Sequence, residues 1–137
     1  MGERRLLVAV VDDEEPVRRA LKRLLTAIGI DVETYASGQE FLGSLAVRQP
    51  DCVVLDVHMP GVSGLEVQEQ LALRAPHIGA VIVTGHHEPA TEERALAANA
   101  VAYLEKPLDE ARLLEAITAA ARVAADRRAR PRRGSGP

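Results

Sequence analysis

The sequence predicts a single α/β domain in which a five-stranded parallel sheet is covered by helices on both faces. Five short apolar runs alternate with five stretches whose apolar residues recur every three or four positions, which is the pattern of strands alternating with amphipathic helices. Right-handed crossovers leave few topologies for such a chain. Its 137 residues, 47% of them apolar, suffice for one compact domain and are too few for two ordinary ones.

The first unit begins with a continuous apolar run over residues 6–11, which predicts a buried strand. An acidic cluster follows at residues 12–15. Pro16 suits the first turn of the next helix, where its missing N–H would have no partner, and Gly29 suits the end of that helix. The apolar residues at helical spacing are Val17, Leu21, Leu24, Leu25 and Ile28.

The second unit combines a short strand over residues 32–35 with a capped helix. Ser37 is a candidate N-cap, and Glu40 lies three residues later, at the spacing of a capping box. The residues expected on the inner face of this helix are Phe41, Leu42 and Leu45.

The third unit contains a strand that runs from Val53 into the carboxylate of Asp56, and the Pro60-Gly61 pair stops it. Ser63 and Glu66 repeat the capping-box spacing before the next helix. Its apolar residues include Leu65, Leu71 and Leu73.

The last two units follow the same plan. A strand over residues 80–83 ends at Thr84, and an alanine-rich helix over residues 89–98 ends at Asn99, a residue that tolerates the left-handed conformation common at helix ends. A strand over residues 101–104 then leads into Glu105-Lys106-Pro107, and the final helix begins near Asp109. Its inner face is expected to hold Leu113, Leu114, Ile117 and Ala120 or Ala121.

Charged and hydroxyl side chains follow four of the strands. They are Asp12 and Asp13, then Asp56, Thr84 and Lys106. Parallel strands present their carboxyl ends at one edge, where α/β sheets bind ligands. Clustered carboxylates favour a bound hard cation such as Mg²⁺, and a lysine with a hydroxyl group suits an oxyanion. The set therefore predicts a carboxylate nucleophile that accepts a phosphoryl group.

Each of these residues also has a simpler interpretation. The carboxylates of residues 12–15 could simply face the positive end of a helix dipole, a role as well suited to Glu14 and Glu15 as the site itself. Thr84 could be a cap, Lys106 a solvated surface residue and Asp56 a structural hydrogen-bond acceptor. Their occurrence at successive strand ends favours the phosphoryl site over this set of separate roles.

Composition excludes several classes of protein. The lone Cys52 rules out an internal disulfide framework and is expected to be a small buried hydrophobe. No segment approaches the roughly 20 apolar residues of a membrane span, so a cytoplasmic location is expected.

Charge is distributed unevenly along the chain. Residues 1–121 contain 11 basic and 19 acidic residues. From residue 122 onward the chain has six arginines and a single acidic residue, Asp126. The acidic part argues against a nucleic-acid-binding domain. We expect a domain over residues 1–122 and, over residues 123–137, a basic disordered tail or the start of a linker. Such a tail is either simply solvated or binds acidic partners or nucleic acid.

Over about residues 5–122 the chain resembles the receiver domain of two-component response regulators, which has the CheY-like, flavodoxin-type (βα)5 fold with strand order 2-1-3-4-5. Residues 35–42 and Thr84-Gly85-His86 are most similar to FixJ-type receivers. The other motifs that carry the resemblance are Val10-Val11-Asp12-Asp13-Glu14, the stretch from Leu55 to Gly64, and Leu104-Glu105-Lys106-Pro107.

The resemblance implies that Asp56 accepts a phosphoryl group from a histidine kinase or phosphotransfer protein. The reaction would need Mg²⁺, with Mn²⁺ as a possible substitute. Asp12, Asp13 and Asp56 would hold the metal together with the backbone carbonyl of His58. The protein would then be a switch with intrinsic autodephosphorylation, and not an enzyme.

The resemblance also assigns the residues around the phosphoryl group. Thr84 and Lys106 would bind its oxygens, and Tyr103 would turn inward when Thr84 moves. The Lys106–Pro107 bond is expected to be cis. A partner, or a second copy of the chain, would bind the surface of the fourth helix, fifth strand and fifth helix.

The chain also departs from the FixJ-type pattern. Asn99 stands where such receivers usually carry glycine. His58 and His86 lie two residues beyond Asp56 and Thr84, where the family controls access of water to the phosphoaspartate. They are either exposed loop residues or residues that tune the lifetime of the phosphorylated state. His77 and His87 are expected to be surface residues.

Two other functions remain to be weighed. A phosphatase of the haloacid-dehalogenase type also uses an aspartyl nucleophile, but it needs a second acid two residues later, where this chain has His58. A phosphorylation-independent interaction module would keep the fold without the switch. The complete set of strand-end residues argues against it.

Overall fold

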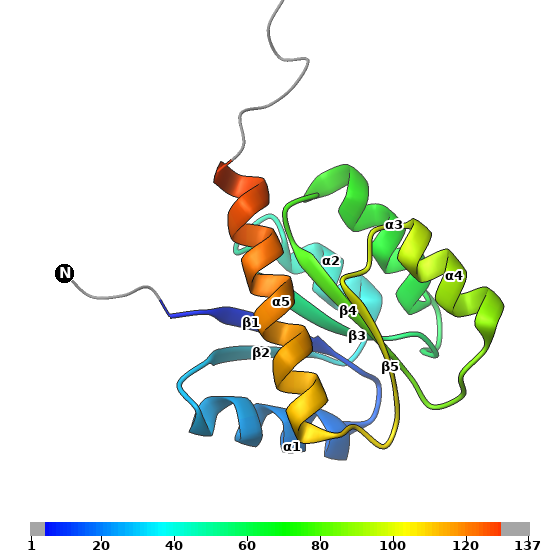
Figure 1. The fold of residues 1–137 in the computed structure, drawn as a ribbon, viewed down its shortest axis with the longest axis horizontal. Coiled ribbons are helices and arrows are strands. Elements are labelled where there is room, and N and C mark those ends of the chain that lie inside the picture. The colour runs from blue at the N-terminus through cyan, green and yellow to red at the C-terminus, as the bar shows by residue number, and fades with distance from the viewer. Residues whose placement is uncertain (1–4, 130–137) are drawn as a thin grey trace, which may run out of the picture.

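The computed structural model describes residues 5–129, in which five strands alternate with five helices (Figure 1). All the strands are parallel, and their order is β2-β1-β3-β4-β5. The predicted fold class and the strand order implied by the resemblance are both confirmed. The elements are β1 (Leu7–Val11), α1 (Glu15–Ala27), β2 (Asp31–Tyr35), α2 (Gly38–Ser44), β3 (Cys52–Asp56), α3 (Gly64–Arg74), β4 (Gly79–Thr84), α4 (Pro89–Ala97), β5 (Ala102–Glu105) and α5 (Glu110–Ala129).

Helices cover both faces of the sheet. Successive strand residues point to opposite faces, so Val8 and Val10 of β1 pack with α1 and α5, whereas Ala9 and Val11 pack on the face covered by α2, α3 and α4. Strands β1, β3 and β4 are buried along their whole length, which explains their continuous apolar runs. The edge strands β2 and β5 are only partly buried.

The local signals read from the sequence lie where they were expected. Pro16 occupies the first turn of α1, and Ser37 caps α2. Before α3, the Ser63 hydroxyl accepts a hydrogen bond from the Glu66 N–H (3.2 Å), and the Glu66 carboxylate accepts one from the Ser63 N–H (2.9 Å). These bonds complete the capping box and lower the pKa of Glu66. Asn99 has the predicted left-handed conformation, with φ 73°.

Helix α5 is longer than the sequence suggested. The apolar period was expected to end near residue 125 and the domain at residue 122, but the helix continues to Ala129 and buries Ala124 completely. The expected boundary therefore falls inside α5. Alanine buries little surface, so this part of the packed face lacks the large apolar residues by which a helical period is recognised. Residues 130–137, the rest of the expected tail, lie outside the described residues.

The last turn of α5 is attached to the amino-terminal edge of the sheet by two arginines. Arg128 Nη1 lies 2.6 Å from Asp51 Oδ1, and the Asp51 carboxylate also accepts the Leu7 N–H at 2.9 Å. Arg127 Nη1 donates to the carbonyl of Pro76 at 3.0 Å. These contacts explain why a stretch rich in arginine continues as helix.

Two apolar residues counted in the helical patterns are exposed. Ile28 is 52% exposed because α1 ends one residue before it, and Leu73 is 80% exposed because it lies two positions after the buried Leu71 and points away from the sheet. Cys52 is fully buried, as predicted, and burial raises its thiol pKa. Within residues 5–129 no helix is long and apolar enough to cross a membrane.

Candidate functional site

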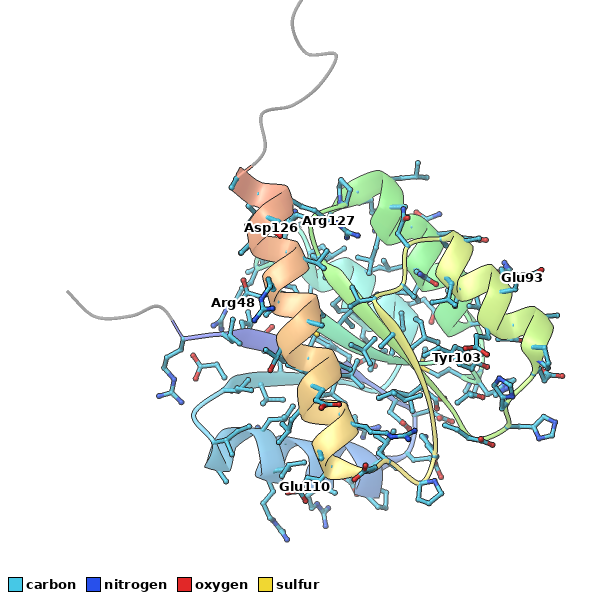
Figure 2. All side chains as sticks on the ribbon, in the orientation of Figure 1. Arg48, Glu93, Tyr103, Glu110, Asp126 and Arg127 are labelled. Carbon is cyan, nitrogen blue, oxygen red and sulfur yellow. The ribbon has the colours of Figure 1, made fainter. Side chains whose placement is uncertain are left out.

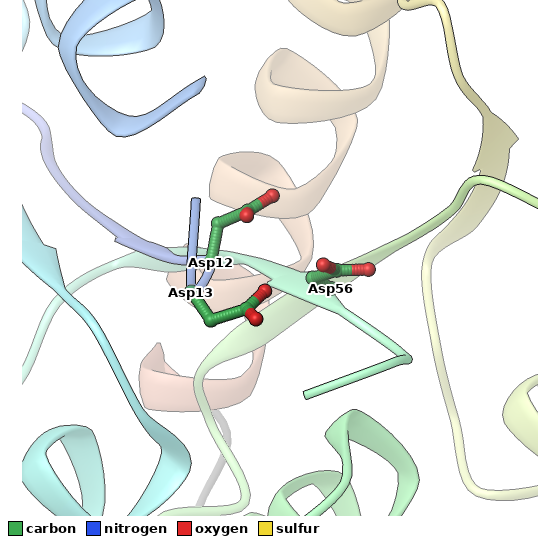
Figure 3. Close-up of side chains that lie close together, drawn as sticks. All are labelled: Asp12, Asp13 and Asp56. Carbon is green, nitrogen blue, oxygen red and sulfur yellow. The ribbon is translucent and has the colours of Figure 1, made fainter. Parts of the chain in front are cut away.

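Three aspartates meet at the carboxyl edge of the sheet (Figure 3). Strands β1 and β3 are neighbours, and Val11 lies opposite Leu55. Asp12 comes directly after β1 and Asp56 is the last residue of β3, so the two aspartates lie at the same level of the sheet. One carboxylate oxygen from each of Asp12, Asp13 and Asp56 lies within 4.8 Å of the other two. Asp12 and Asp56 are buried, whereas Asp13 is exposed. The structure therefore brings together the three acids that the strand ends predicted.

Asp56 is held in an environment that disfavours its charge. Burial and, secondly, the charge of Asp12 raise its pKa, although Lys106 and the backbone N–H of His58 act in the opposite direction. The N–H of His58 donates to Asp56 Oδ1 at 3.3 Å, which leaves Oδ2 on the side of Lys106. A bound cation would stabilise the charged form of this carboxylate, which burial and the neighbouring acid disfavour.

Lys106 supplies the positive charge of the site. Its Nζ lies 2.8 Å from Asp12 Oδ2, 3.5 Å from Asp56 Oδ2 and 3.4 Å from Glu14 Oε1. Burial lowers the lysine pKa, but the hydrogen bond to Asp12 and the surrounding carboxylates outweigh it, so the pKa is raised. Lys106 is thus a permanent cation at the site. The Lys106–Pro107 bond that follows is cis, as expected.

Thr84 lies at the same edge, at the end of β4, and is completely buried. Its hydroxyl donates to the carbonyl of His86 at 3.0 Å and accepts the N–H of His86 at 3.1 Å. The hydroxyl is therefore engaged by its own loop, an arrangement that the sequence did not indicate.

The remaining candidates occupy different surroundings. The side chains of His58 and His86 are both exposed in loops that follow β3 and β4. Tyr103 is partly buried on β5 and packs against the core on the α2–α4 face. His77 is half-buried, and burial and the charge of Arg128 lower its pKa.

Sequence reasoning missed several contacts of the site. The Asp12 side chain accepts the N–H of Glu14 at 2.9 Å, and the Asp12 carbonyl accepts a hydrogen bond from Arg18 at 2.8 Å. The first of these has a recognisable signal, because aspartate often binds backbone two residues on. His87, which was expected to be a surface residue, forms a hydrogen bond with Glu92 and packs against the ring of Tyr103. The contact could not be predicted from the sequence, because Tyr103 lies on a strand 16 residues after His87 and no sequence pattern relates the two positions.

The donor set fits a hard divalent cation. Three carboxylates converge, no histidine or cysteine joins them among the described residues, and burial raises the pKa of one of them. Oxygen ligands with room for water are what Mg²⁺ prefers. Lys106 neutralises only part of this acidic group. The residues present are therefore suited to Mg²⁺, the metal that the resemblance implied.

Comparison with known proteins agrees with this geometry. The response regulator receiver domain family matches residues 8–118. Nodulation protein W of Bradyrhizobium diazoefficiens is 39% identical over 83% of this chain and 50% of its own length, and the transcriptional regulatory protein FixJ of Azorhizobium caulinodans is 37% identical over 83% and 54%. The crystal structure of a receiver protein from Burkholderia phymatum is 42% identical, with a TM-score of 0.76 over 85% of this chain and 95% of that one.

The chain spans about half the length of the curated relatives it matches. The family match over residues 8–118 extends from within β1 into α5. The predicted resemblance to FixJ-type receivers is confirmed. The chain belongs to the response regulator receiver family of two-component systems.

Proposed function

We propose that Asp56 is the phosphoacceptor of this receiver. The observation that carries the proposal is a buried carboxylate at the end of β3, with Asp12 and Lys106 against it. Asp56 attacks the phosphorus of a phosphohistidine; the P–N bond breaks as the O–P bond forms. The electron pair of the broken bond stays on the imidazole nitrogen, so no oxidant or further reactant is needed.

Mg²⁺ would be held by Asp12, Asp13 and Asp56, with the backbone carbonyl of His58, and Mn²⁺ would substitute for it. When bound, the metal neutralises charge on the phosphoryl oxygens. The support for this assignment is the convergence of three carboxylates within 4.8 Å.

Lys106 and Thr84 bind the phosphoryl oxygens in this proposal. Lys106 Nζ already lies 3.5 Å from Asp56 Oδ2, so a small movement suffices for it to reach a phosphoryl oxygen. Thr84 must first release the backbone of His86. This release shifts an existing equilibrium between two conformations, and Tyr103 changes its position with it.

The partners follow from the switch. A histidine kinase or phosphotransfer protein supplies the phosphoryl group, and the surface of α4, β5 and α5 binds a downstream partner or a second copy of the chain. The protein acts in the cytoplasm.

Phosphorylation ends by attack of water on the phosphoaspartate. The exposed side chains of His58 and His86 lie in the loops that follow β3 and β4, and we assign them the tuning of this rate. Unchanged dephosphorylation rates in His58→Ala and His86→Ala would remove that assignment.

Intact mass after incubation with acetyl phosphate and Mg²⁺ tests the function. The wild type should gain one phosphoryl adduct, and EDTA or Asp56→Asn should abolish it; size-exclusion of the two forms then tests for a dimer. Without an adduct under rapid quenching, and without binding of beryllofluoride, the phosphorylation-independent interaction module would be the better description.

A further inference from the structure

The loop between β4 and α4 links the strand end at Thr84 to Tyr103. Thr84 holds the backbone of His86 through two hydrogen bonds of 3.0 and 3.1 Å. The next residue, His87, packs its ring edge-on against Tyr103, with the centroids 5.6 Å apart and the planes at 67°. The loop therefore connects the two residues through consecutive positions of the chain.

The same histidine reaches the first turns of α4. His87 Nε2 lies 2.7 Å from Glu92 Oε1, and the two side chains are each 40% exposed. His87 is thus bound on one side by a carboxylate of α4 and on the other by an aromatic ring of β5. We call these three residues, His87, Glu92 and Tyr103, the loop latch.

Tyr103 depends on this packing for its position. Its hydroxyl is inaccessible to solvent and has no hydrogen-bond partner among the described residues. A buried hydroxyl without a partner is unfavourable, so the ring is not held in place by its polar end. The contact with His87 and the core on the α2–α4 face remain to hold it.

Helix α4 has few other attachments to the domain, and one of them is the exposed ion pair of Arg94 with Glu69 of α3 (2.9 Å). Ala95 is its single buried residue. Gln68 of α3 holds the carboxyl-terminal end by donating to the carbonyls of Ala95 (2.9 Å) and Ala98 (3.0 Å). At the amino-terminal end of α4, the side-chain contact that reaches β5 runs through Glu92 and His87.

We propose that His87 is a positioning residue that holds Tyr103 and the amino-terminal end of α4 in the resting conformation. This inference rests on the proposed function. The latch is closed in the conformation in which the Thr84 hydroxyl is bound to His86, and that hydroxyl is unavailable to a phosphoryl oxygen. Release of His86 by Thr84 moves the residue next to His87, so phosphorylation opens the latch. Removal of the latch stabilises the phosphorylated conformation relative to the resting one.

The test uses Tyr103 as its own reporter. The chain has two tyrosines and no tryptophan, so Tyr35→Phe leaves one tyrosine in the protein. In that background, binding of beryllofluoride with Mg²⁺ is measured by titration, and acrylamide quenching of Tyr103 is measured before and after. Without beryllofluoride, His87→Ala should shift the quenching of Tyr103 toward the value that the parent shows with beryllofluoride bound. It should also tighten beryllofluoride binding between about twofold and about tenfold, the effect of losing one aromatic contact.

Three further variants separate the contacts. His87→Phe keeps a ring beside Tyr103 and loses the bond to Glu92, and Glu92→Gln weakens that bond and leaves both rings; each should give a smaller change than His87→Ala. Glu93→Gln changes the neighbouring exposed carboxylate on α4, which has no described contact with the latch, and should match the parent (Figure 2). Circular dichroism checks that each variant is folded.

The outcomes distinguish the latch from the switch itself. A parent that gains the acetyl phosphate adduct and binds beryllofluoride, with His87→Ala unchanged or binding more weakly, would overturn the latch alone. A parent that does neither would overturn the proposed function and the latch together. Should His87→Ala fail to fold, His87→Phe decides: binding equal to that of the parent would refute a role for the Glu92 bond.

Discussion

Gly64→Ala should destabilise the domain and displace Asp56. Gly64 is the first residue of α3, and its N–H donates to the carbonyl of Val57 at 3.0 Å. A β-carbon at this position would overlap the carbonyl oxygen of Asp56 and lie 2.9 Å from Val57 Cα. These are backbone atoms at the end of a buried strand, so no side chain can rotate away to make room.

The magnitude follows from two opposing effects. Overpacking of a tight site costs about 1–3 kcal/mol, and contact with backbone favours the upper end of that range. Replacement of glycine by alanine in a helix recovers at most about 1 kcal/mol. The net loss is therefore about 1–2 kcal/mol. Gly43→Ala in α2 is the matched control, because a β-carbon there meets nothing within 4 Å and the same replacement should stabilise the domain.

Urea unfolding followed by circular dichroism at equal pH measures both variants. A net loss of this size lowers the urea midpoint by roughly 0.5–1 M, whereas Gly43→Ala should raise it slightly. Phosphorylation by acetyl phosphate should also slow in Gly64→Ala and not in Gly43→Ala. Equal midpoints for Gly64→Ala and the wild type, or a shift in the same direction for both variants, would refute the argument from close packing.

Three other perturbations test separate parts of the structure. Ser63→Ala removes the capping box before α3 and should cost about 1 kcal/mol, measured as a lower thermal midpoint; an unchanged midpoint would mean that the two short bonds contribute nothing. Arg128→Ala leaves the buried Asp51 without its 2.6 Å contact and should cost about 1–3 kcal/mol in urea, with Arg112→Ala on the exposed face of α5 as the control. The pKa of His77 is lowered in the fold, so the unfolded chain binds the proton more readily, and stability should fall as pH drops below the usual histidine value. His77→Gln should make the urea midpoint depend less on pH between pH 7.5 and 5. If the midpoint falls with pH as steeply as in the wild type, other groups cause the loss of stability.

The fold and the location of the site could be predicted because each depends on short-range patterns. The buried strands read as continuous apolar runs, and the sheet confirms them. The convergence of Asp12 and Asp56 follows from strand direction alone, since parallel neighbours end at one edge. Ser63 and Asn99 show the same principle for helix ends, because their roles depend on only a few neighbouring residues.

Other features depend on packing between distant segments and had no such signal. The length of α5 was underestimated because the partner of Arg128, Asp51, lies far away in the sequence, directly before β3. The hydroxyl of Thr84 could be placed at the site, but its engagement by His86 depends on the path of the loop. His87 was expected to be a surface residue; its contact with Tyr103 exists because β4, α4 and β5 bring the loop over that ring.

By itself the sequence determined the order and type of the elements and the set of side chains delivered to one edge, because apolar periodicity and strand direction are local properties. The tertiary structure alone decided how those side chains pair: Lys106 lies closer to Asp12 than to Asp56, and the His87 ring packs edge-on against Tyr103. Such pairing depends on differences of about 1 Å between segments far apart in the chain, and sequence patterns carry no information at that scale.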